Sequence, residues 1–277
     1  TSMISPLRRV LVRRPSRDGD WAGGGWRTPD VGLLARQHEA FCELLARLGV
    51  EVEVAAALDG QVDSVYMHDP LVMTGRGGIV LRMAKPARRA EPCHAAEELE
   101  RLAIPVLGKL AAPACADGGD RFWLDDTTMA VGLGYRTNRA GAEAISSLVE
   151  PEGLTVEAYD MPHDRGPDSV LHLQSFVSGI SEDLLVVYEP LTPVRLLEDL
   201  RARGFDLIAI DHDDYLALGC NVLSVRPGVV VMCDSARGVR RALERRGIEV
   251  HVYEGSELSL KGDGGPTCLT APLLRSA

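Results

Sequence analysis

Five polar motifs recur along the chain at nearly equal intervals, and each carries a side chain that could do chemistry. They are VYMHDP with Asp69, CADGGD with Asp117, VLHLQS with His172, LGCNVL with Asn221 and GPTCLT with Cys268. The intervals between these residues are 48, 55, 49 and 47. Equivalent points of repeated modules converge on the axis of a closed ring. We therefore expect two carboxylates, an imidazole, an amide and a thiol to meet at one centre.

Such a set suits nucleophilic catalysis on a positively charged substrate. A cysteine attacks as a thiolate, whose formation needs a nearby cation or helix N-terminus, and a histidine can give or take the proton of the leaving group. An aspartate can hold that histidine or pair with a cationic substrate, and both roles stay open. Carboxylates accept the N–H groups of a planar guanidinium in pairs. A guanidino compound is therefore a suitable substrate for this site.

The elements that must position these motifs form a repeat. Five runs rich in Val, Leu and Ile are typical of strands, and each is followed by a helical pattern and a second strand-like run. The first strands are expected over 8–14, 78–83, 128–134, 183–189 and 228–234, the helices over 34–49, 94–103, 140–149, 193–204 and 236–247, and the second strands from Val50, Ile104, Leu154, Phe205 and Ile248. This pattern predicts one α/β domain over residues 1–277, with five modules in a ring.

Two segments, 16–30 and 161–169, fit the repeat poorly and are expected to be loops, because both are rich in Gly, Pro and Asp. The first carries Trp21 and Trp26 beside its glycines. A mobile lid and a plain surface loop are both consistent with this composition.

The composition argues against several classes of function. The chain has 277 residues and a net charge of −10, which disfavours a nucleic acid or an anionic membrane as a partner. No apolar run approaches the roughly 20 residues of a membrane helix, and the first residues are too polar for a secretory signal. Thr1 and Ser2, before Met3, are expected to be a cloning remnant. The six cysteines form no CxxC pair, so we expect a cytoplasmic protein with no metal site and no disulfide framework.

Several segments together resemble the guanidino-group-modifying pentein superfamily. They are DSVYMHDP, DGGDRFWLDDTTMAVGLGYRTNRAG, LHLQS, GCNVLSV and GGPTCL, and the resemblance runs from about Asp63 to Leu269. It is nearest to the dimethylarginine dimethylaminohydrolases, while arginine deiminases and amidinotransferases belong to the same superfamily. The resemblance implies a five-bladed α/β propeller of ββαβ-type modules. It also implies a small guanidino substrate, no cofactor, and a monomer or homodimer.

The resemblance implies a role for each candidate residue. Cys268 attacks the guanidinium carbon to form a covalent thiouronium, His172 is the general acid and base, and Asp117 orients the guanidinium and the histidine. The expected substrate-binding residues are Asp69, Arg136, Arg88, His68 and Asp120. Among these, Asp69 pairs with the guanidinium nitrogens, the two arginines clamp the α-carboxylate of the substrate, and Asp120 supports the site from behind.

Three departures from the family pattern bear on the substrate. His68 stands where dimethylarginine hydrolases usually carry an acid. Deiminases and amidinotransferases have H-x-D where this chain has His172, Leu173 and Gln174, which favours a hydrolase of substituted guanidines. Asp117 is one methylene shorter than the usual acid, so we expect a small shift or a bridging water between it and its partner.

Three alternatives stay open. One is an arginine deiminase or dihydrolase, or an amidinotransferase. Another is a hydrolase of a different guanidino compound. A ribosome-associated binding protein of the same fold is the non-enzymatic alternative, and it would need a strongly basic face.

Overall fold

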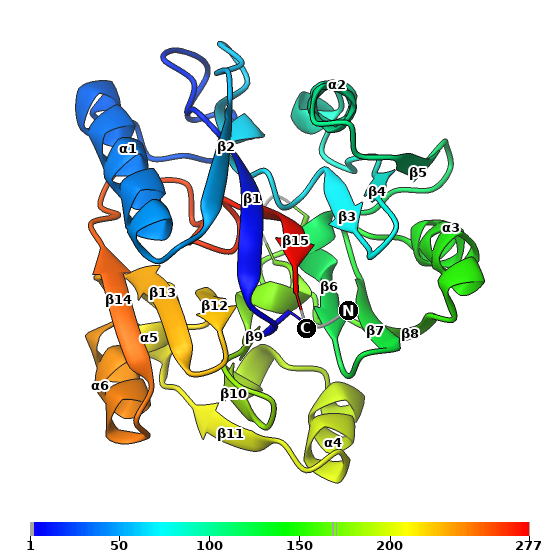
Figure 1. The fold of residues 1–277 in the computed structure, drawn as a ribbon, viewed down its shortest axis with the longest axis vertical. Coiled ribbons are helices and arrows are strands. Elements are labelled where there is room, and N and C mark those ends of the chain that lie inside the picture. Colours follow the sequence, from blue (N-terminus) through cyan, green and yellow to red (C-terminus); the bar gives the residue numbers. More distant parts are fainter. Residues whose placement is uncertain (1–2, 168, 170, 277) are drawn as a thin grey trace.

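Five three-stranded sheets surround a common axis in the computed structural model, which describes residues 3–167, 169 and 171–276 (Figure 1). Thr1 and Ser2, the expected cloning remnant, lie outside these residues, as does Asp168 of the second predicted loop. In each sheet the first strand pairs antiparallel with the middle strand, and the third strand pairs parallel with it.

The strands of each sheet follow in the same order. The first strands are β15 (Ala271–Arg275), β3 (Leu71–Met73), β6 (Arg121–Trp123), β9 (Val177–Gly179) and β12 (Val222–Arg226). The middle strands are β1 (Leu7–Arg13), β4 (Gly78–Val80), β7 (Thr128–Leu133), β10 (Leu184–Val187) and β13 (Val229–Cys233). The third strands are β2 (Glu51–Ala55), β5 (Val106–Lys109), β8 (Thr155–Asp160), β11 (Asp206–Ala209) and β14 (Glu249–Tyr253).

One helix joins the middle and third strands of every sheet, as parallel pairing requires. These helices are α1 (Val31–Arg47), α2 (Glu91–Arg101), α3 (Arg139–Val149), α4 (Val194–Ala202) and α6 (Arg237–Arg245), and a short α5 (His212–Leu216) follows β11. In α1 the Asp30 side chain accepts a hydrogen bond from Leu33 N, and Leu34, Phe41 and Leu45 are fully buried. These three side chains recur at helical spacing, so one apolar face of α1 packs against the core.

The ring closes between the two ends of the described chain. Strand β15 pairs antiparallel with β1, with Leu11 opposite Ala271. The prediction that the last motif precedes the first module is therefore confirmed. The apolar periodicity predicted a strand, a helix and a second strand in each module. Each module of the described chain has one more strand, which precedes these elements. The missing first strands have only three to five residues, too few to show clear alternation, and only the family resemblance implied them.

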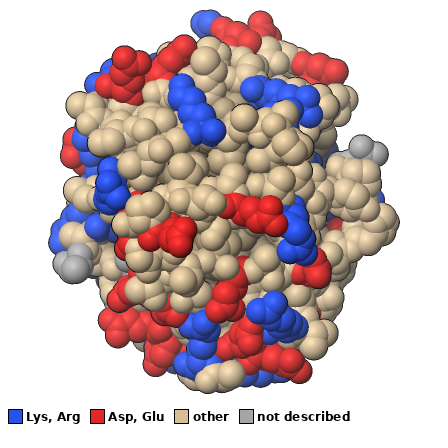
Figure 2. Space-filling view, turned by 90° about the vertical axis from the view of Figure 1, so that its right-hand side faces the viewer, with Lys and Arg blue, Asp and Glu red and all other residues tan. Residues whose placement is uncertain are grey.

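The outer surface carries interspersed charges of both signs. Figure 2 shows lysines and arginines next to aspartates and glutamates on one face, with no continuous basic area there. None of the helices in the described part of the chain is both long and apolar enough to cross a membrane.

Candidate active site

All five motifs lie at one end of the ring, because each directly precedes the first strand of a sheet. Asn221 is next to β12, and Asp69 is two residues before β3. Backbone contacts link the motifs: Gly118 N donates to Asp69 O at 2.8 Å, and His68 N donates to Cys268 O at 3.1 Å. The predicted convergence of motifs far apart in sequence is therefore present.

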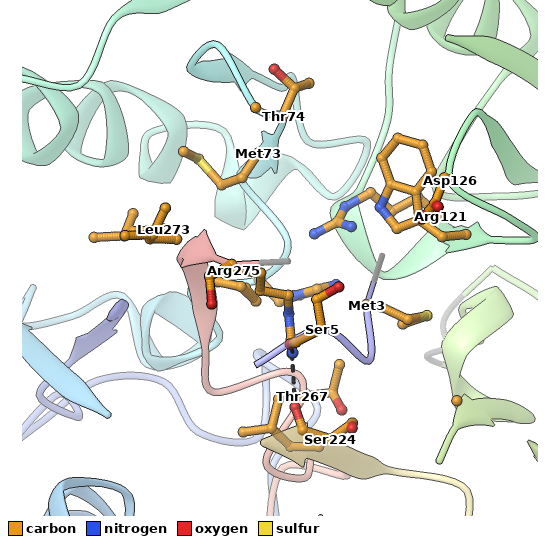
Figure 3. Close-up of a pocket in the computed structure, with 18 of the residues that line it drawn as sticks. Met3, Ser5, Met73, Thr74, Arg121, Asp126, Ser224, Thr267, Leu273 and Arg275 are labelled. Carbon is orange, nitrogen blue, oxygen red and sulfur yellow. Dashed lines mark hydrogen bonds between the residues drawn. The ribbon is translucent and has the colours of Figure 1, made fainter. Parts of the chain in front are cut away.

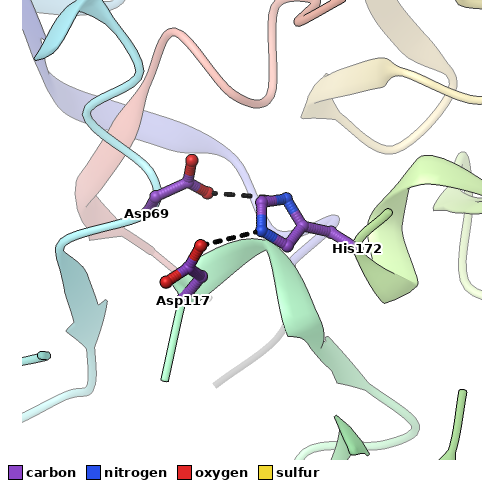
Figure 4. Close-up of side chains that lie close together, drawn as sticks. All are labelled: Asp69, Asp117 and His172. Atoms are coloured by element: carbon purple, nitrogen blue, oxygen red, sulfur yellow. Dashed lines mark hydrogen bonds and ion pairs between the residues drawn. The ribbon is translucent and has the colours of Figure 1, made fainter. Parts of the chain in front are cut away.

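His172 lies between two carboxylates (Figure 4). Its Nε2 is 3.1 Å from Oδ2 of Asp117, and its Nδ1 is 3.9 Å from Oδ1 of Asp69. All three side chains are buried. At 3.9 Å the Asp69 contact is too long for a hydrogen bond, so Asp69 Oδ1 is buried without a hydrogen-bond partner in the described part of the chain, as is Asp117 Oδ1, the oxygen that does not contact His172. Buried carboxylate oxygens without donors are costly, so this geometry calls for a donor-rich cation.

The shorter acid at position 117 contacts His172 directly at 3.1 Å, so no bridging water is needed between them. The glycines after it explain the close approach. A Cβ added at Gly119 would lie 2.6 Å from His172 Nδ1, and one at Gly118 would lie 2.1 Å from the His68 carbonyl oxygen. The loop can therefore pass closer to the imidazole than any larger residue would permit, which compensates for the missing methylene.

Asn221 holds the thiol of Cys268. Its Nδ2 donates to Sγ at 3.0 Å, and its Oδ1 accepts from Thr267 N at 3.0 Å. A Cβ at Gly265 would lie 2.6 Å from the amide carbon of Asn221, so this glycine is required for the contact. The motif spacing had placed Asn221 at the centre, but no role was assigned to it. The structure makes it the positioning residue of the thiol.

The carboxylates set opposite protonation preferences on the two reactive groups. Burial disfavours the imidazolium, yet the charges of Asp69, Asp120 and Asp117 outweigh it and raise the pKa of His172 to about 9. Burial and the charge of Asp69 raise the pKa of Cys268 to about 12, against the smaller opposing effect of Asn221. Without substrate, the site near neutral pH therefore holds a thiol beside an imidazolium.

The negative charge of Asp69 should lower the reactivity of the Cys268 thiol, because it raises the pKa of that thiol. We expect Asp69→Asn to accelerate alkylation of Cys268 by neutral iodoacetamide, because loss of the adjacent negative charge lowers the pKa of the thiol. In both proteins the rate should rise about tenfold per pH unit, since the thiolate fraction does so below its pKa. Mass spectrometry of the modified peptide measures the rate. Asp263→Asn, in the same cavity, is the matched control. A slower reaction in Asp69→Asn would contradict the assigned electrostatics.

The thiol opens onto a cavity of about 330 Å³. This volume is at the lower end of the range for small-molecule sites. The lining includes both acidic and basic residues: Asp63, Asp69, Asp263, Lys85, Arg88, Arg136 and Arg165, together with Tyr66, His172 and Cys268. A ligand with separated positive and negative groups matches this lining.

The two predicted carboxylate clamps differ in their availability. Arg88 is buried and donates to Asp69 Oδ2 at 2.6 Å and to both oxygens of Glu91. Glu91, which sequence reasoning missed, and Asp69 therefore already occupy much of this guanidinium. Arg136 is also buried and lines the cavity, but its guanidinium has no hydrogen-bond or ion-pair partner in 3–167, 169 and 171–276. The Arg136 guanidinium is therefore available to a ligand, so the carboxylate clamp stays a prediction for this residue, whereas Arg88 holds Asp69.

Two other predicted substrate-binding residues do not line this cavity. His68 faces the opposite end of the ring, where its Nδ1 is 3.0 Å from Thr270 O and its Nε2 is 3.1 Å from Gln174 Nε2. His68 and Asp69 lie in the turn over 67–70, and their side chains line opposite cavities, with Asp69 on the side of Cys268. Asp120 accepts from Thr137 Oγ1 and Leu173 N, and thus supports the loop of His172 from behind, as expected.

The loop over 16–30 forms one wall of the cavity through Gly24 and Gly25. Trp26 is buried, and its Nε1 donates to Asp63 Oδ1 at 2.8 Å. Lys85 Nζ donates to the Gly24 carbonyl at 2.6 Å and to the other oxygen of Asp63. Neither Asp63 nor Lys85 was among the predicted site residues. This loop is in place over the site, whereas its motion as a lid stays a prediction.

One cluster in the described part of the chain has metal-ligand geometry, namely Asp69, Asp117 and His172, whose ligand atoms lie within 4.8 Å of one another. The cation of Arg88 already contacts Asp69 Oδ2, and His172 Nε2 already contacts Asp117. A divalent ion would have to displace both contacts. The cluster therefore fits an organic cation better than a metal.

Solved structures first define the class of protein. A mutant of DDAH from Pseudomonas aeruginosa complexed with citrulline has a TM-score of 0.81 over 96% of this chain and 98% of its own, at 23% identity. The product-bound N-terminal domain of ArgZ, an arginine dihydrolase of cyanobacteria, has a TM-score of 0.83 over 96% and 97%, at 18% identity. This chain has the same five-module pentein fold.

Sequence comparison then gives the family. A family model described as N,N dimethylarginine dimethylhydrolase, eukaryotic, matches residues 33–275, and the chain belongs to this family. It is 32% identical over 192 residues to N(G),N(G)-dimethylarginine dimethylaminohydrolase of Streptomyces coelicolor, covering 68% of this chain and 71% of that protein. It is 26% identical to arginine deiminase of Listeria welshimeri, covering 79% and 63%. The protein is thus a guanidino-modifying hydrolase that acts on amidino C–N bonds.

Proposed function

We propose that the protein hydrolyses the guanidino group of a substituted arginine, giving a citrulline-type ureido product and an amine. The observation that carries the proposal is a pair of buried carboxylate oxygens beside His172, one each of Asp69 and Asp117, that accept no hydrogen bond from any described residue. A guanidinium supplies in-plane N–H donors for both. Asp69 is also close enough to Cys268 for its charge to raise the pKa of the thiol. A guanidinium bound to Asp69 would therefore have its carbon near the thiol.

Substrate binding activates the nucleophile in this proposal. The bound cation offsets the charge of Asp69 and thereby lowers the pKa of the Cys268 thiol. The thiol proton then leaves to solvent. The thiolate Sγ forms a bond to the guanidinium carbon. Imidazolium of His172 then protonates the substituted nitrogen, and the C–N bond breaks to release the amine. A positively charged thiouronium and a neutral His172 remain.

Hydrolysis completes the cycle with the same residues. Neutral His172 takes a proton from water, and the hydroxide oxygen forms a bond to the thiouronium carbon. The C–S bond then breaks as the hydroxyl proton passes to solvent, the neutral ureido product leaves, and Cys268 returns to the thiolate. Asp117 holds His172 through both steps by its 3.1 Å contact, and Asn221 receives the returning sulfur.

A product assay with asymmetric dimethylarginine, arginine and other guanidino acids tests the substrate. Dimethylamine with citrulline from the first compound supports the proposal. Ammonia from arginine at a higher kcat/KM would favour the deiminase or dihydrolase alternative, which the 26% identity to an arginine deiminase keeps in view. Transfer of the amidino group to a second amine would indicate a transferase. Failure of every guanidino compound would overturn the proposal.

The role of Arg136 leads to a separate prediction. We expect Arg136→Gln to raise KM by about 10- to 100-fold with a smaller change in kcat, because a charged clamp on the α-carboxylate acts far from the reacting carbon. Steady-state kinetics with the preferred amino acid measures the split. Agmatine, which lacks the carboxylate, should show no such rise. Arg165→Gln, an exposed arginine at the same cavity, is the control. An equal loss on both substrates would remove the clamp assignment.

A further inference from the structure

A second cavity, of about 480 Å³, lies at the end of the ring opposite the thiol (Figure 3). Residues of the first strands and of their far ends line it, among them Met73, Trp123, Ser224 and Leu273. His68 also lines this cavity, while Asp69, next in sequence, lines the cavity of Cys268. The two cavities are therefore separated by the layer of side chains at the motifs.

Two arginines, Arg121 and Arg275, place positive charge in the lining of this second cavity. Arg121, the first residue of β6, is 6% exposed. Its Nε is buried without a hydrogen-bond partner, and no ion pair involves this side chain in 3–167, 169 and 171–276. Arg275, the last residue of β15, donates to the neutral carbonyls of Ser5 and Ser224, and it has no ion pair with any other described residue. Figure 3 shows the Arg121 side chain directed toward the space beside Arg275.

The pKa shifts of the two arginines agree with the lack of a carboxylate partner for either side chain among the described residues. Burial lowers the pKa of Arg121 to about 10 with no carboxylate opposing it. Burial, together with repulsion from Arg121, lowers the pKa of Arg275 to about 9. Among the described residues that line the cavity, Asp126 is the one with an acidic side chain, and it is exposed. Buried guanidinium groups are normally paired with anions.

We propose that this cavity binds an organic anion, a carboxylate or phosphate with an apolar part, between Arg121 and Arg275. Guanidinium forks recognise both kinds of anion through paired N–H donors. The apolar part would lie against Met73, Trp123 and Leu273, which line the same space. The site is distinct from the cavity of Cys268 and is independent of the proposed hydrolysis.

Calorimetric titration of the whole protein with phenyl phosphate, benzoate, inorganic phosphate and neutral benzyl alcohol tests the site. We expect saturable binding of phenyl phosphate or benzoate, no binding of benzyl alcohol, and affinity at least tenfold weaker in both Arg121→Met and Arg275→Met. The exposed Arg241→Gln variant controls for net charge. Binding of inorganic phosphate alone, lost in both variants, would retain the anion site but refute the apolar part. No saturable binding, or equal affinity in all variants, would overturn the proposal.

Two further measurements keep the result interpretable. Arg136→Gln removes the proposed carboxylate clamp of the Cys268 cavity and should leave anion binding in the second cavity intact. Loss of anion binding in Arg136→Gln would assign the anion to the Cys268 cavity and overturn the inference. In the absence of anion, Arg121→Met should melt no lower than the wild type, because it removes an uncompensated buried charge. If that variant fails to fold, Arg121→Lys and Arg275→Met carry the comparison.

Discussion

Replacing Cys268 by serine is expected to lower kcat by about 10⁴-fold or more, with the fold intact. The hydroxyl keeps the volume and can still accept from Asn221 Nδ2, but it is a much weaker nucleophile in a site whose carboxylates already oppose a negative charge at this position. Steady-state turnover of the guanidino substrate measures the loss, and thermal melting verifies the fold. Mass spectrometry of the quenched wild-type reaction should show a covalent adduct on Cys268 that the variant lacks.

The remaining cysteines provide the control. Cys93 is exposed and away from the ring axis on α2, so Cys93→Ser should retain full activity. Activity within a factor of about ten of the wild type in Cys268→Ser would contradict a nucleophilic role, because a serine hydroxyl is a far weaker nucleophile than a cysteine thiolate.

Replacing His172 by asparagine is expected to lower kcat by about 10²- to 10⁴-fold, the range for loss of a general acid and base. The loss should be largest for substrates with poor leaving amines, because these need protonation most. Half-buried His251, on β14 and paired with Glu249, is the matched control as His251→Asn. Full activity of His172→Asn would remove the proton-transfer role.

The pH profile separates this role from a structural one. In the wild type the imidazolium is present below the pKa of about 9 and is lost above it. Since the Asp117 charge raises that pKa, Asp117→Asn should lower it and move the alkaline limb of the kcat profile toward neutral pH. A loss of rate with an unchanged profile would instead indicate that Asp117 only holds the loop.

Local patterns were sufficient to predict much of the fold and the centre of the site. Apolar runs and helical faces marked ten of the fifteen strands and the five crossover helices, because their alternation and length depend on residues close in sequence. The five motifs were found by spacing alone. The short first strands, such as β3, were missed because three buried residues carry no periodicity.

The sequence by itself determined that five equivalent motifs meet on one axis, and hence that Cys268, His172 and the two aspartates lie together. Only the tertiary structure decided which charges neutralise one another. Glu91 and Asp69 occupy Arg88, Arg136 is left for a ligand, and His68 faces away from the thiol. It also brought Arg121 and Arg275, from opposite parts of the chain, to one cavity. The physical reason is that repeats arise from local patterns, whereas ion pairing depends on side-chain direction and distance across the ring.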